Sequence, residues 1–555
     1  MSSASDGAVT VVVIAYNDAA NVADAVDSAL AQGDVVAEVV VVDDASTDDT
    51  PRVLRQITAT EPRVRVVRRT ANSGGCGTPR NDGIEAARSP WVVFLDSDDV
   101  LPPKAVDALL AAGLRHDADV AAGLCVRREL PSGRELPWQA ELFTAESAHD
   151  GVAARPRTLW DTLSVNKIYR RGFLREKHIR FPDGAAHYED FVFTARLYAA
   201  HPRFAVIPDT VYIWHVRYGT AQASISLRRD RITNWQDRVA AHQQVLDIMR
   251  DSGEEELLTA AQTKFLEHDL AVYLRELPQR APEYQNQWWR ISREHVRAFG
   301  AEAVRRATPA ARWRTAVLLG RERTAAPLVR LAGLAADPPR LEPPYAGDAE
   351  RPLWDEAGGA DEAVELDGLA DAALEELPLY VAATVRAGCR LVLELRLGDL
   401  YGRTAQAGPR HAVVELRHRL TGRTHQYQAA WHAADSPRGP HRLHRSRGWK
   451  SRAEQLEWRA RVVIDASALC ERDVITTWDL GATLVFRDGG SVATAVRAGA
   501  GLGRRVQVGR RGKVLLLQPY ATSSGWLALR VADGLAGVRR VFAARLRRRI
   551  RRGRH

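Results

Sequence analysis

The first hundred residues alternate short apolar runs with segments whose apolar residues recur at helical spacing. The apolar runs are rich in β-branched residues and predict buried strands over 9–15, 39–42, 64–67 and 91–95. Residues 21–31 predict a helix, because their apolar positions are Val22, Ala25, Val26, Ala29 and Leu30. Strands that alternate with helices at this spacing predict βαβ units and a mostly parallel α/β sheet.

The periodicity changes twice further along the chain. Residues 225–334 have a helical pattern, and residues 337–351 are rich in proline and charge, which is typical of a linker. Short alternating segments with turn signals between them then predict a β-sandwich, with strands over 390–397, 411–418, 456–464 and 483–487. The predicted division is an α/β domain (1–228), a helical segment (229–336), a linker (337–352), a β-rich sandwich domain (353–537) and a basic tail (538–555).

The net charge of +9 comes from one end of the chain. Residues 538–555 contain nine arginines and no acidic residue, so the rest of the chain is neutral. Apolar residues recur there every four positions, which predicts a basic amphipathic helix suited to an anionic membrane surface. A disordered tail that aids solubility is the alternative. The neutral body has no stripe of basic and aromatic residues, so nucleic acid is not a predicted partner.

Targeting signals are not evident in the sequence. No apolar run reaches the ~18–20 residues that a bilayer-spanning helix needs, and the first ten residues lack the pattern of a signal peptide. The four cysteines are far apart and have no metal or redox spacing: Cys76, Cys125, Cys389 and Cys470. These features predict a cytoplasmic protein that is peripheral at the inner face of the plasma membrane through its basic tail.

Polar residues follow each predicted strand of the α/β domain, where open sheets bind their ligands. Asp96 and Asp98 come directly after a buried strand, and two such carboxylates suit Mg²⁺ or Mn²⁺ shared with substrate phosphates. Taken alone, such a pair is more often a loop or cap feature. The glycines of residues 72–81 allow close backbone approach, and Arg80 offers a fork for a diphosphate. A tight surface turn and a salt bridge are the alternatives.

The order of the motifs resembles the family 2 glycosyltransferases of GT-A fold. The resemblance covers about residues 8–228 and runs through VVVIAYND (11–18), VVVDDASTDDT (40–50), NSGGCGTPRNDGIEAA (72–87), WVVFLDSDD (91–99), NKIYRR (166–171), FPDG (181–184), HYEDF (187–191) and VYIWHVR (211–217). It implies a Rossmann-like GT-A sheet and inverting, metal-dependent transfer of a sugar from a nucleotide sugar. The signature of membrane-embedded processive synthases, Q-x-x-R-W, is missing.

The resemblance also implies a role for each matching residue. The nucleotide-sugar site would comprise Ala15, Tyr16, Asn17, Asp44, Asn72, Arg80, Asp96 and Ser97. Asp98 would bind the divalent metal, with His215 as a second ligand for which a structural role is the alternative. Asp190 would be the base that deprotonates the acceptor hydroxyl, and Glu189 would position donor or acceptor. For Asp190 the alternative is an acid favoured by the dipole of the helix that follows.

The domain order resembles enzymes that decorate wall teichoic acid or similar anionic polymers. The sequence therefore predicts transfer from a nucleotide sugar, favouring a UDP-sugar, to a cell-envelope polymer or a lipid-linked glycan. The β-rich domain is expected to bind polymer or to mediate homo-oligomers, with a simple packing module as the alternative. The rival functions are a catalytically silent envelope-glycan binding protein and a nucleotidyltransferase on a similar scaffold. The acids Asp96, Asp98 and Asp190 favour an active enzyme, and AYNDAAN after the first strand disfavours a nucleotidyltransferase.

Overall fold

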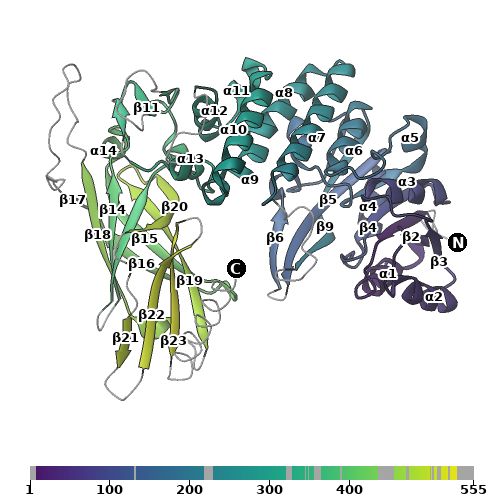
Figure 1. Cartoon of the computed structure of the whole chain (residues 1–555), viewed down its shortest axis with the longest axis horizontal. Helices are drawn as coiled ribbons and strands as arrows, with labels where there is room; N and C mark the ends of the chain where they lie inside the picture. Colours follow the sequence, from purple (N-terminus) through teal and green to yellow (C-terminus); the bar gives the residue numbers. More distant parts are fainter. Residues whose placement is uncertain are drawn as a thin grey trace. The chain divides into compact units, whose positions relative to one another are not determined.

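The computed structural model places most of the chain in two compact units (Figure 1). It describes residues 8–130, 133–217, 229–320, 328–343, 345–347, 349–354, 364–387, 391–434, 456–470, 474–499, 502, 505–508, 514–522 and 525–533. The first unit comprises residues 1–265 and 298–306, and the second comprises 266–297 and 307–555. The domain boundaries drawn from the sequence stay predictions.

A mixed sheet forms the centre of the first unit. Its order is β3-β2-β1-β4-β8-β5-β9-β7, with β6 beside β5. The strands are β1 (Val9–Ala15), β2 (Val36–Asp43), β3 (Val64–Arg68), β4 (Trp91–Asp96), β5 (Val120–Leu130), β6 (Arg134–Trp138), β7 (Ser147–Asp150), β8 (Lys167–Arg170) and β9 (Arg203–Arg217). The four strands predicted from apolar runs are β1 to β4, and they pair in parallel. The α/β prediction is confirmed, and the sheet is mixed because β8 runs antiparallel to both β4 and β5.

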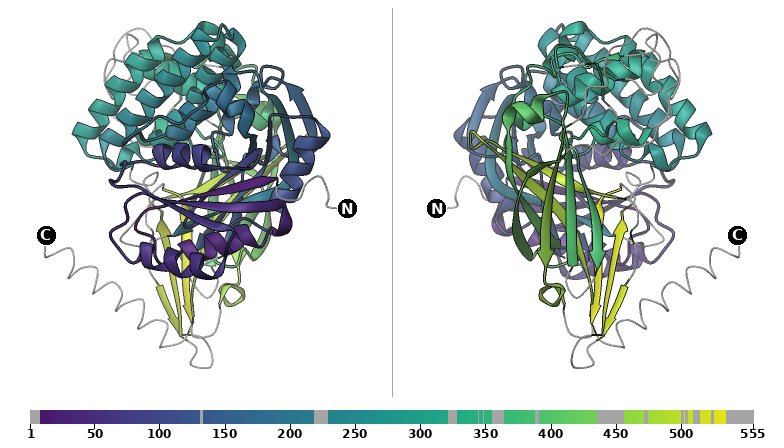
Figure 2. Two further views of the ribbon diagram at one scale, coloured as in Figure 1. Left: turned by 90° about the vertical axis from the view of Figure 1, so that its right-hand side faces the viewer. Right: turned by 90° about the vertical axis from the view of Figure 1, so that its left-hand side faces the viewer.

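Helices cover both faces of this sheet (Figure 2), which is why its parallel strands are continuous apolar runs rather than alternating ones. The helix α3 lies especially close to β1, since a Cβ on Gly83 would be only 2.1 Å from Val12 Cγ1. The helices around the sheet are α1 (Val22–Leu30), α2 (Thr50–Thr60), α3 (Gly77–Ala86), α4 (Ala105–Arg115), α5 (Arg171–Glu176) and α6 (Glu189–Ala199).

The helical pattern predicted for the middle of the chain is confirmed. The first unit contains α7 (Ile232–Asp251), α8 (Glu255–Lys264) and α11 (Ala301–Arg306), and the second contains α9 (Leu270–Leu274), α10 (Pro282–Arg297), α12 (Pro309–Gly320) and α13 (Leu328–Leu334). A π-helical turn covers Phe265–Asp269. In the part of the chain that the structure describes, no helix has both the length and the apolar character needed to cross a bilayer.

The second unit ends in a β-rich domain whose main sheet contains β13 to β23, which confirms the predicted sandwich-like fold. Burial alternates along its strands, most regularly along β19. The strands are β10 (Ala346–Gly347), β11 (Pro352–Trp354), β12 (Val364–Glu365), β13 (Val381–Ala387), β14 (Leu391–Gly398), β15 (Pro409–His418), β16 (Thr424–Ala430), β17 (His432–Ala434), β18 (Glu457–Ile464), β19 (Ile475–Phe486), β20 (Ser491–Ala498), β21 (Arg505–Val508), β22 (Val514–Ala521) and β23 (Leu527–Asp533), with the short helix α14 (Arg403–Ala407). The basic tail, 538–555, lies outside the described residues.

Candidate active site

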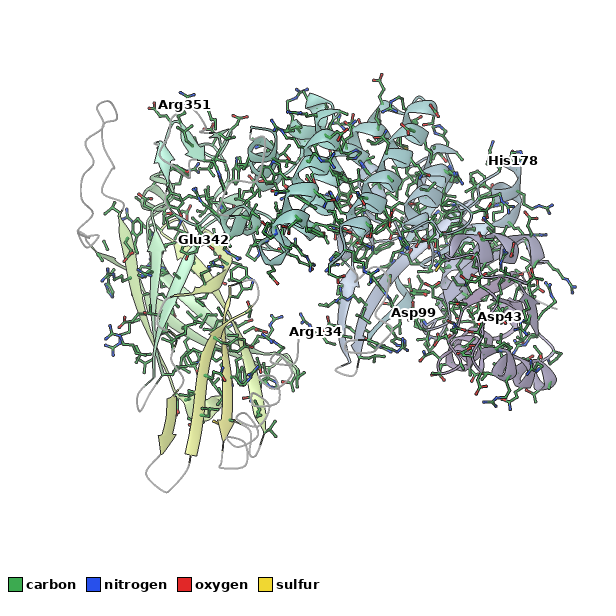
Figure 3. All side chains as sticks on the ribbon, in the orientation of Figure 1. Asp43, Asp99, Arg134, His178, Glu342 and Arg351 are labelled. Carbon is green, nitrogen blue, oxygen red and sulfur yellow. The ribbon has the colours of Figure 1, made fainter. Side chains whose placement is uncertain are left out.

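The carboxyl ends of β1, β2 and β4 meet at one edge of the first unit's sheet. The backbone N–H of Asp44 donates to the carbonyl oxygen of Ala15 at 2.9 Å, and that of Ser97 donates to Ile14 at 3.1 Å. Asp43, which ends β2, and Asp99, just beyond β4, are labelled in Figure 3. The structure therefore brings the predicted nucleotide-site residues of these three strands to one place, as the rule for open α/β sheets requires.

Asp44 is buried and holds the loop that follows β3. Its carboxylate accepts hydrogen bonds from Asn72 Nδ2 at 2.9 Å and from the hydroxyl of Ser73 at 2.8 Å. Arg69 Nε lies 2.9 Å from the same carboxylate. Asp44 and Asn72 are thus neighbours, and the carboxylate orders the loop that would face a nucleotide. Direct contact of either residue with a nucleotide stays a prediction.

Asn17 joins the chain after β1 to the chain after β2. Its backbone has a positive φ of 51°, and its Oδ1 accepts the N–H of Thr47 at 2.7 Å. The neighbouring Tyr16 is 49% exposed, although large aromatic side chains are usually well buried. An exposed ring at the carboxyl edge of the sheet is available to a ligand, and the nucleotide role that the resemblance implies for Tyr16 stays a prediction.

The glycine-rich loop before α3 packs against the segment that leads to α6. A Cβ on Gly75 would lie 2.7 Å from the carbonyl oxygen of Gly184, and one on Gly77 would lie 2.3 Å from that of Pro182. The loop is further tied by Thr78, whose hydroxyl accepts the N–H of Gly184 at 2.9 Å. These glycines therefore allow the chain to approach its own backbone. The contact couples the loop of Asn72 to the segment that carries the predicted base.

One buried arginine joins the donor side of the site to the predicted base. Arg80 Nη2 donates to Asp96 Oδ1 at 2.8 Å, while Nη1 donates to Glu189 Oε1 at 2.9 Å and to Asp190 Oδ1 at 3.0 Å. The Arg80 side chain is only 3% exposed. The sequence left two roles open for Arg80, binding of a diphosphate and a salt bridge, and both would use the same guanidinium nitrogens. In this structure those nitrogens bind carboxylates. The contact of Arg80 with the nucleotide stays a prediction.

Glu189 and Asp190, beside Arg80, have raised pKa values. Burial, followed by repulsion from Asp190, raises the pKa of Glu189 to about 7. Burial also raises the pKa of Asp190, against the attraction of Arg80 and the hydrogen bond from Ser164. A general base is most effective when its pKa is raised toward the working pH, so the pair is suited to accept a proton.

Asp98 and His215 lie together at the end of β4. His215 Nδ1 is 3.1 Å from the backbone carbonyl oxygen of Asp98, so the Nδ1–H tautomer donates there and Nε2 carries the lone pair. Arg217 Nη1 is 3.3 Å from Asp98 Oδ2. Desolvation raises the pKa of Asp98 to about 6, and the carboxylates of Asp96 and Asp18 add to this rise, against Arg217.

A divalent cation fits this pair of residues. Burial is the main cause of the raised pKa of Asp98, and the additional rise from the carboxylates of Asp96 and Asp18 reflects negative charge that attracts a cation. Metal-binding histidines commonly donate their other ring N–H to a backbone carbonyl, as His215 does here. Among the described residues, no group of three or more His, Cys, Asp or Glu side chains is arranged to hold a metal. Substrate phosphates and water would therefore have to complete the coordination, as is usual for Mg²⁺.

Comparison with known proteins identifies the family. The model of "Glycosyl transferase family 2" matches residues 10–177. Succinoglycan biosynthesis protein ExoU of Rhizobium meliloti is 30% identical over 237 residues, which are 41% of this chain and 69% of ExoU. The chain belongs to glycosyl transferase family 2. Succinoglycan biosynthesis protein ExoO of the same organism is 36% identical over 233 residues, 40% of this chain and 64% of ExoO.

One relative is similar to this chain in both sequence and fold. The poly(ribitol-phosphate) beta-N-acetylglucosaminyltransferase TarS of Staphylococcus aureus is 33% identical over 177 residues, 32% of this chain and 30% of TarS. The crystal structure of S. aureus TarS superposes with a TM-score of 0.50 and 18% identity, covering 95% of this chain and 85% of that one. The family 2 domain and the helical and β-rich parts that follow it therefore share the fold of TarS.

Sequence reasoning missed a buried ion pair in the segment that leads to β8. Lys167 Nζ lies 2.5 Å from Asp161 Oδ2 and donates to the carbonyl oxygen of Leu163 at 2.6 Å, and both charged side chains are almost completely buried. The nearby Ser164 donates to Asp190 Oδ1 at 2.8 Å. Lys167 belongs to the family motif at 166–171, to which no role was assigned, and no local pattern marks Ser164 or Asp161.

Replacing Lys167 by methionine is expected to lower the free energy of unfolding of the first unit by about 3–5 kcal/mol, because Asp161 would remain buried without its cation. Urea unfolding followed by fluorescence and circular dichroism measures this change. Lys177→Met is the matched control, since Lys177 is a half-exposed lysine paired with Glu176 at 3.5 Å. Equal midpoints for the two variants would contradict a stabilising role for the buried pair.

Proposed function

We propose that this chain is an inverting, metal-dependent glycosyltransferase that uses a nucleotide sugar, in the first instance a UDP-sugar. The acceptor is a hydroxyl group of a teichoic-acid-like envelope polymer or of a lipid-linked glycan. Asp190 takes the proton of that hydroxyl while its oxygen attacks the anomeric carbon. The bond from the anomeric carbon to the diphosphate breaks in the same displacement, and the nucleoside diphosphate leaves.

The contact of Arg80 with both Asp96 and Asp190 supports this proposal most directly. The two hydrogen bonds, of 2.8 and 3.0 Å, leave from different nitrogens of one guanidinium group. The predicted donor-binding acid and the predicted base are therefore separated by a single rigid, planar group. Direct displacement with inversion requires such a base beside the donor sugar, on the face opposite the leaving group.

The residues around the donor support the remaining roles. Tyr16, Asp44 and Asn72 lie at the edge where a nucleotide would bind, and Asp98 and His215 would hold the cation. A bound divalent cation supplies positive charge that neutralises the departing diphosphate. Asp96 remains about one-third exposed despite its bond to Arg80, so its carboxylate can still contact the ribose or the sugar.

The acceptor class is proposed from the similarity to TarS. As its name states, TarS transfers N-acetylglucosamine to poly(ribitol phosphate), and its fold matches across the family 2, helical and β-rich parts. Because the sequence match covers only 30% of TarS, the sugar and the polymer of this chain are proposals. Docking of the basic tail at the cytoplasmic face of the membrane and assembly through the β-rich domain stay predictions.

The proposed function is tested by measuring nucleotide release and sugar transfer from UDP-, GDP- and dTDP-sugars with a polyol-phosphate polymer as acceptor. With Mn²⁺, one donor is expected to react, and EDTA should slow the reaction at least about tenfold, because the leaving diphosphate loses its counter-charge. Adding Mn²⁺ back in excess should restore the rate.

A pair of variants separates the metal site from general effects. Asp98→Asn is expected to weaken activation by Mn²⁺, whereas Asp107→Asn, an exposed position on α4, should behave as the wild type. Full activity in EDTA would contradict the metal role. Absence of both turnover and nucleotide binding with every donor would contradict the enzyme and favour the silent glycan-binding alternative.

A further inference from the structure

We infer that Ser164 is a positioning residue for Asp190, one that selects which oxygen of the base receives the acceptor's proton. This inference rests on the proposed function, because it assigns a role relative to the proposed base. Ser164 is fully buried in the segment between Trp160 and β8.

Ser164 and Arg80 bind the same oxygen of Asp190. The Ser164 hydroxyl donates to Oδ1 at 2.8 Å, and Arg80 Nη1 donates to Oδ1 at 3.0 Å. Neither of these two side chains donates to Oδ2, the backbone N–H of Ser164 also stabilises the carboxylate, and the Asp190 side chain is 22% exposed. With Oδ1 occupied by two donors, Oδ2 is the oxygen that faces an incoming hydroxyl and accepts its proton.

The segment that carries Ser164 is fixed at several points. Lys167 Nζ holds it through Asp161 Oδ2 at 2.5 Å and the carbonyl oxygen of Leu163 at 2.6 Å. The hydroxyl of Tyr169 donates to the carbonyl oxygen of Ser164 at 2.7 Å, and that of Tyr198 donates to Asp161 at 3.0 Å. A hydroxyl anchored in this way keeps its direction when substrates bind.

Lys167, which holds the segment of Ser164, lies in the middle of the sheet. Lys167 begins β8, which pairs with β4 on one side and with β5 on the other. Asp96, whose carboxylate accepts the hydrogen bond from Arg80 Nη2, is the last residue of β4. Ser164 is thus held next to β8, and Arg80 is held by the last residue of the adjacent strand β4. Central strands are among the least mobile parts of a fold, so both donors to Asp190 keep fixed positions.

The Ser164 hydroxyl favours the charged form of Asp190, since a hydrogen bond to a carboxylate stabilises the anion. The hydroxyl of Ser164 and the cation Arg80 both lower the pKa of Asp190, whereas burial and Asp96 raise it. The titratable and charged groups that act on this carboxylate are Arg80, Cys76, Asp96, Glu189 and Tyr169. Arg238 and Lys264 lie over the ring of the neighbouring Phe191, and the ion pair of Asp161 and Lys167 lies in the segment that carries Ser164. Among the described side chains that donate to the Asp190 carboxylate, Arg80 is charged and Ser164 is uncharged.

The test measures kcat, donor KM and the pH profile of the full chain and its Ser164→Ala variant. Ser164→Ala is expected to lower kcat about tenfold or more with little change in donor KM, because the lost contact serves the proton-accepting group. Without the Ser164 hydroxyl the pKa of Asp190 should rise, because its anion loses a hydrogen bond. The acidic limb of the pH profile should therefore move to higher pH. Ser164→Thr, which keeps a hydroxyl, should return the limb to its wild-type position.

Thr263→Val on α8 is the matched control. It removes another buried hydroxyl from the same unit, one that donates to the carbonyl oxygens of Thr259 and Ala303. A Ser164→Ala variant with the wild-type kcat and acidic limb would overturn the inference while leaving the proposed function intact. The same limb shift in Thr263→Val would also overturn it. A wild-type chain without turnover or nucleotide binding would instead overturn the proposed function, and the role of Ser164 with it.

Discussion

Replacement of Asp190 by asparagine is expected to lower kcat by about 10²- to 10⁴-fold, the usual contribution of a positioned general base. Asparagine keeps the shape of the side chain and can still accept the bonds from Ser164 and Arg80, but it cannot take up a proton. Steady-state transfer kinetics measure the loss. Donor affinity, measured by calorimetry, is expected to stay near that of the wild type.

The stability of the Asp190→Asn variant should not fall. One of three carboxylates around Arg80 becomes neutral, and the repulsion that helps raise the pKa of Glu189 to about 7 is removed. Asp247→Asn, at a half-exposed position on α7 that pairs with Arg250, serves as the matched control and should retain full activity. Turnover close to the wild type in Asp190→Asn would exclude Asp190 as the base.

Replacement of Arg80 by methionine is expected to affect both stability and activity. Three carboxylates would lose their shared cation, and the loss of a partner from a buried ionic cluster costs about 3–5 kcal/mol of unfolding free energy. The pKa of Asp190 should rise, because the attraction of Arg80 opposes burial there. Asp190 then stays protonated, and inactive as a base, up to a higher pH. The acidic limb of the pH profile of kcat should therefore move to higher pH, and the rate at neutral pH should fall. Urea unfolding and pH–rate profiles measure the two effects.

Arg80→Lys separates geometry from charge. A lysine keeps the positive charge but lacks the planar fork that reaches Asp96 and Asp190 from two nitrogens, so an intermediate rate is expected. If Arg80 also binds the nucleotide directly, the Arg80 variants should show a higher KM for the donor. Arg55→Met, at an exposed position on α2, is the control. A wild-type pH profile in Arg80→Met would contradict the electrostatic role of this residue.

Local sequence patterns located the secondary structure of the family 2 domain well. The β-branched runs became β1 to β4 with ends shifted by a few residues, because a strand buried on both faces must be apolar throughout. The mixed character of the sheet was not predictable in this way. Only four residues form β8, and its insertion between β4 and β5 depends on pairing with strands that are distant in sequence.

The glycine-rich loop shows how the same residues can be understood differently once the fold is known. The sequence indicated that its glycines permit close approach of a backbone, which holds for Gly75 and Gly77. The approaching group is the chain's own segment 182–184, about a hundred residues further along. Glycines in a sequence indicate that another group comes close to the backbone, but they do not identify that group.

The sequence by itself determined the family, the α/β and β-rich fold classes, and the types of residue that follow the strands. It could do so because strand periodicity and motif order are local properties, and parallel strands place their carboxyl ends at one edge. The tertiary structure decided which groups touch. Arg80 meets Glu189 and Asp190 across 109 and 110 residues, and Ser164 meets Asp190 across 26. Such contacts arise from the packing of α3, α6 and β8, which residue spacing along the chain does not encode.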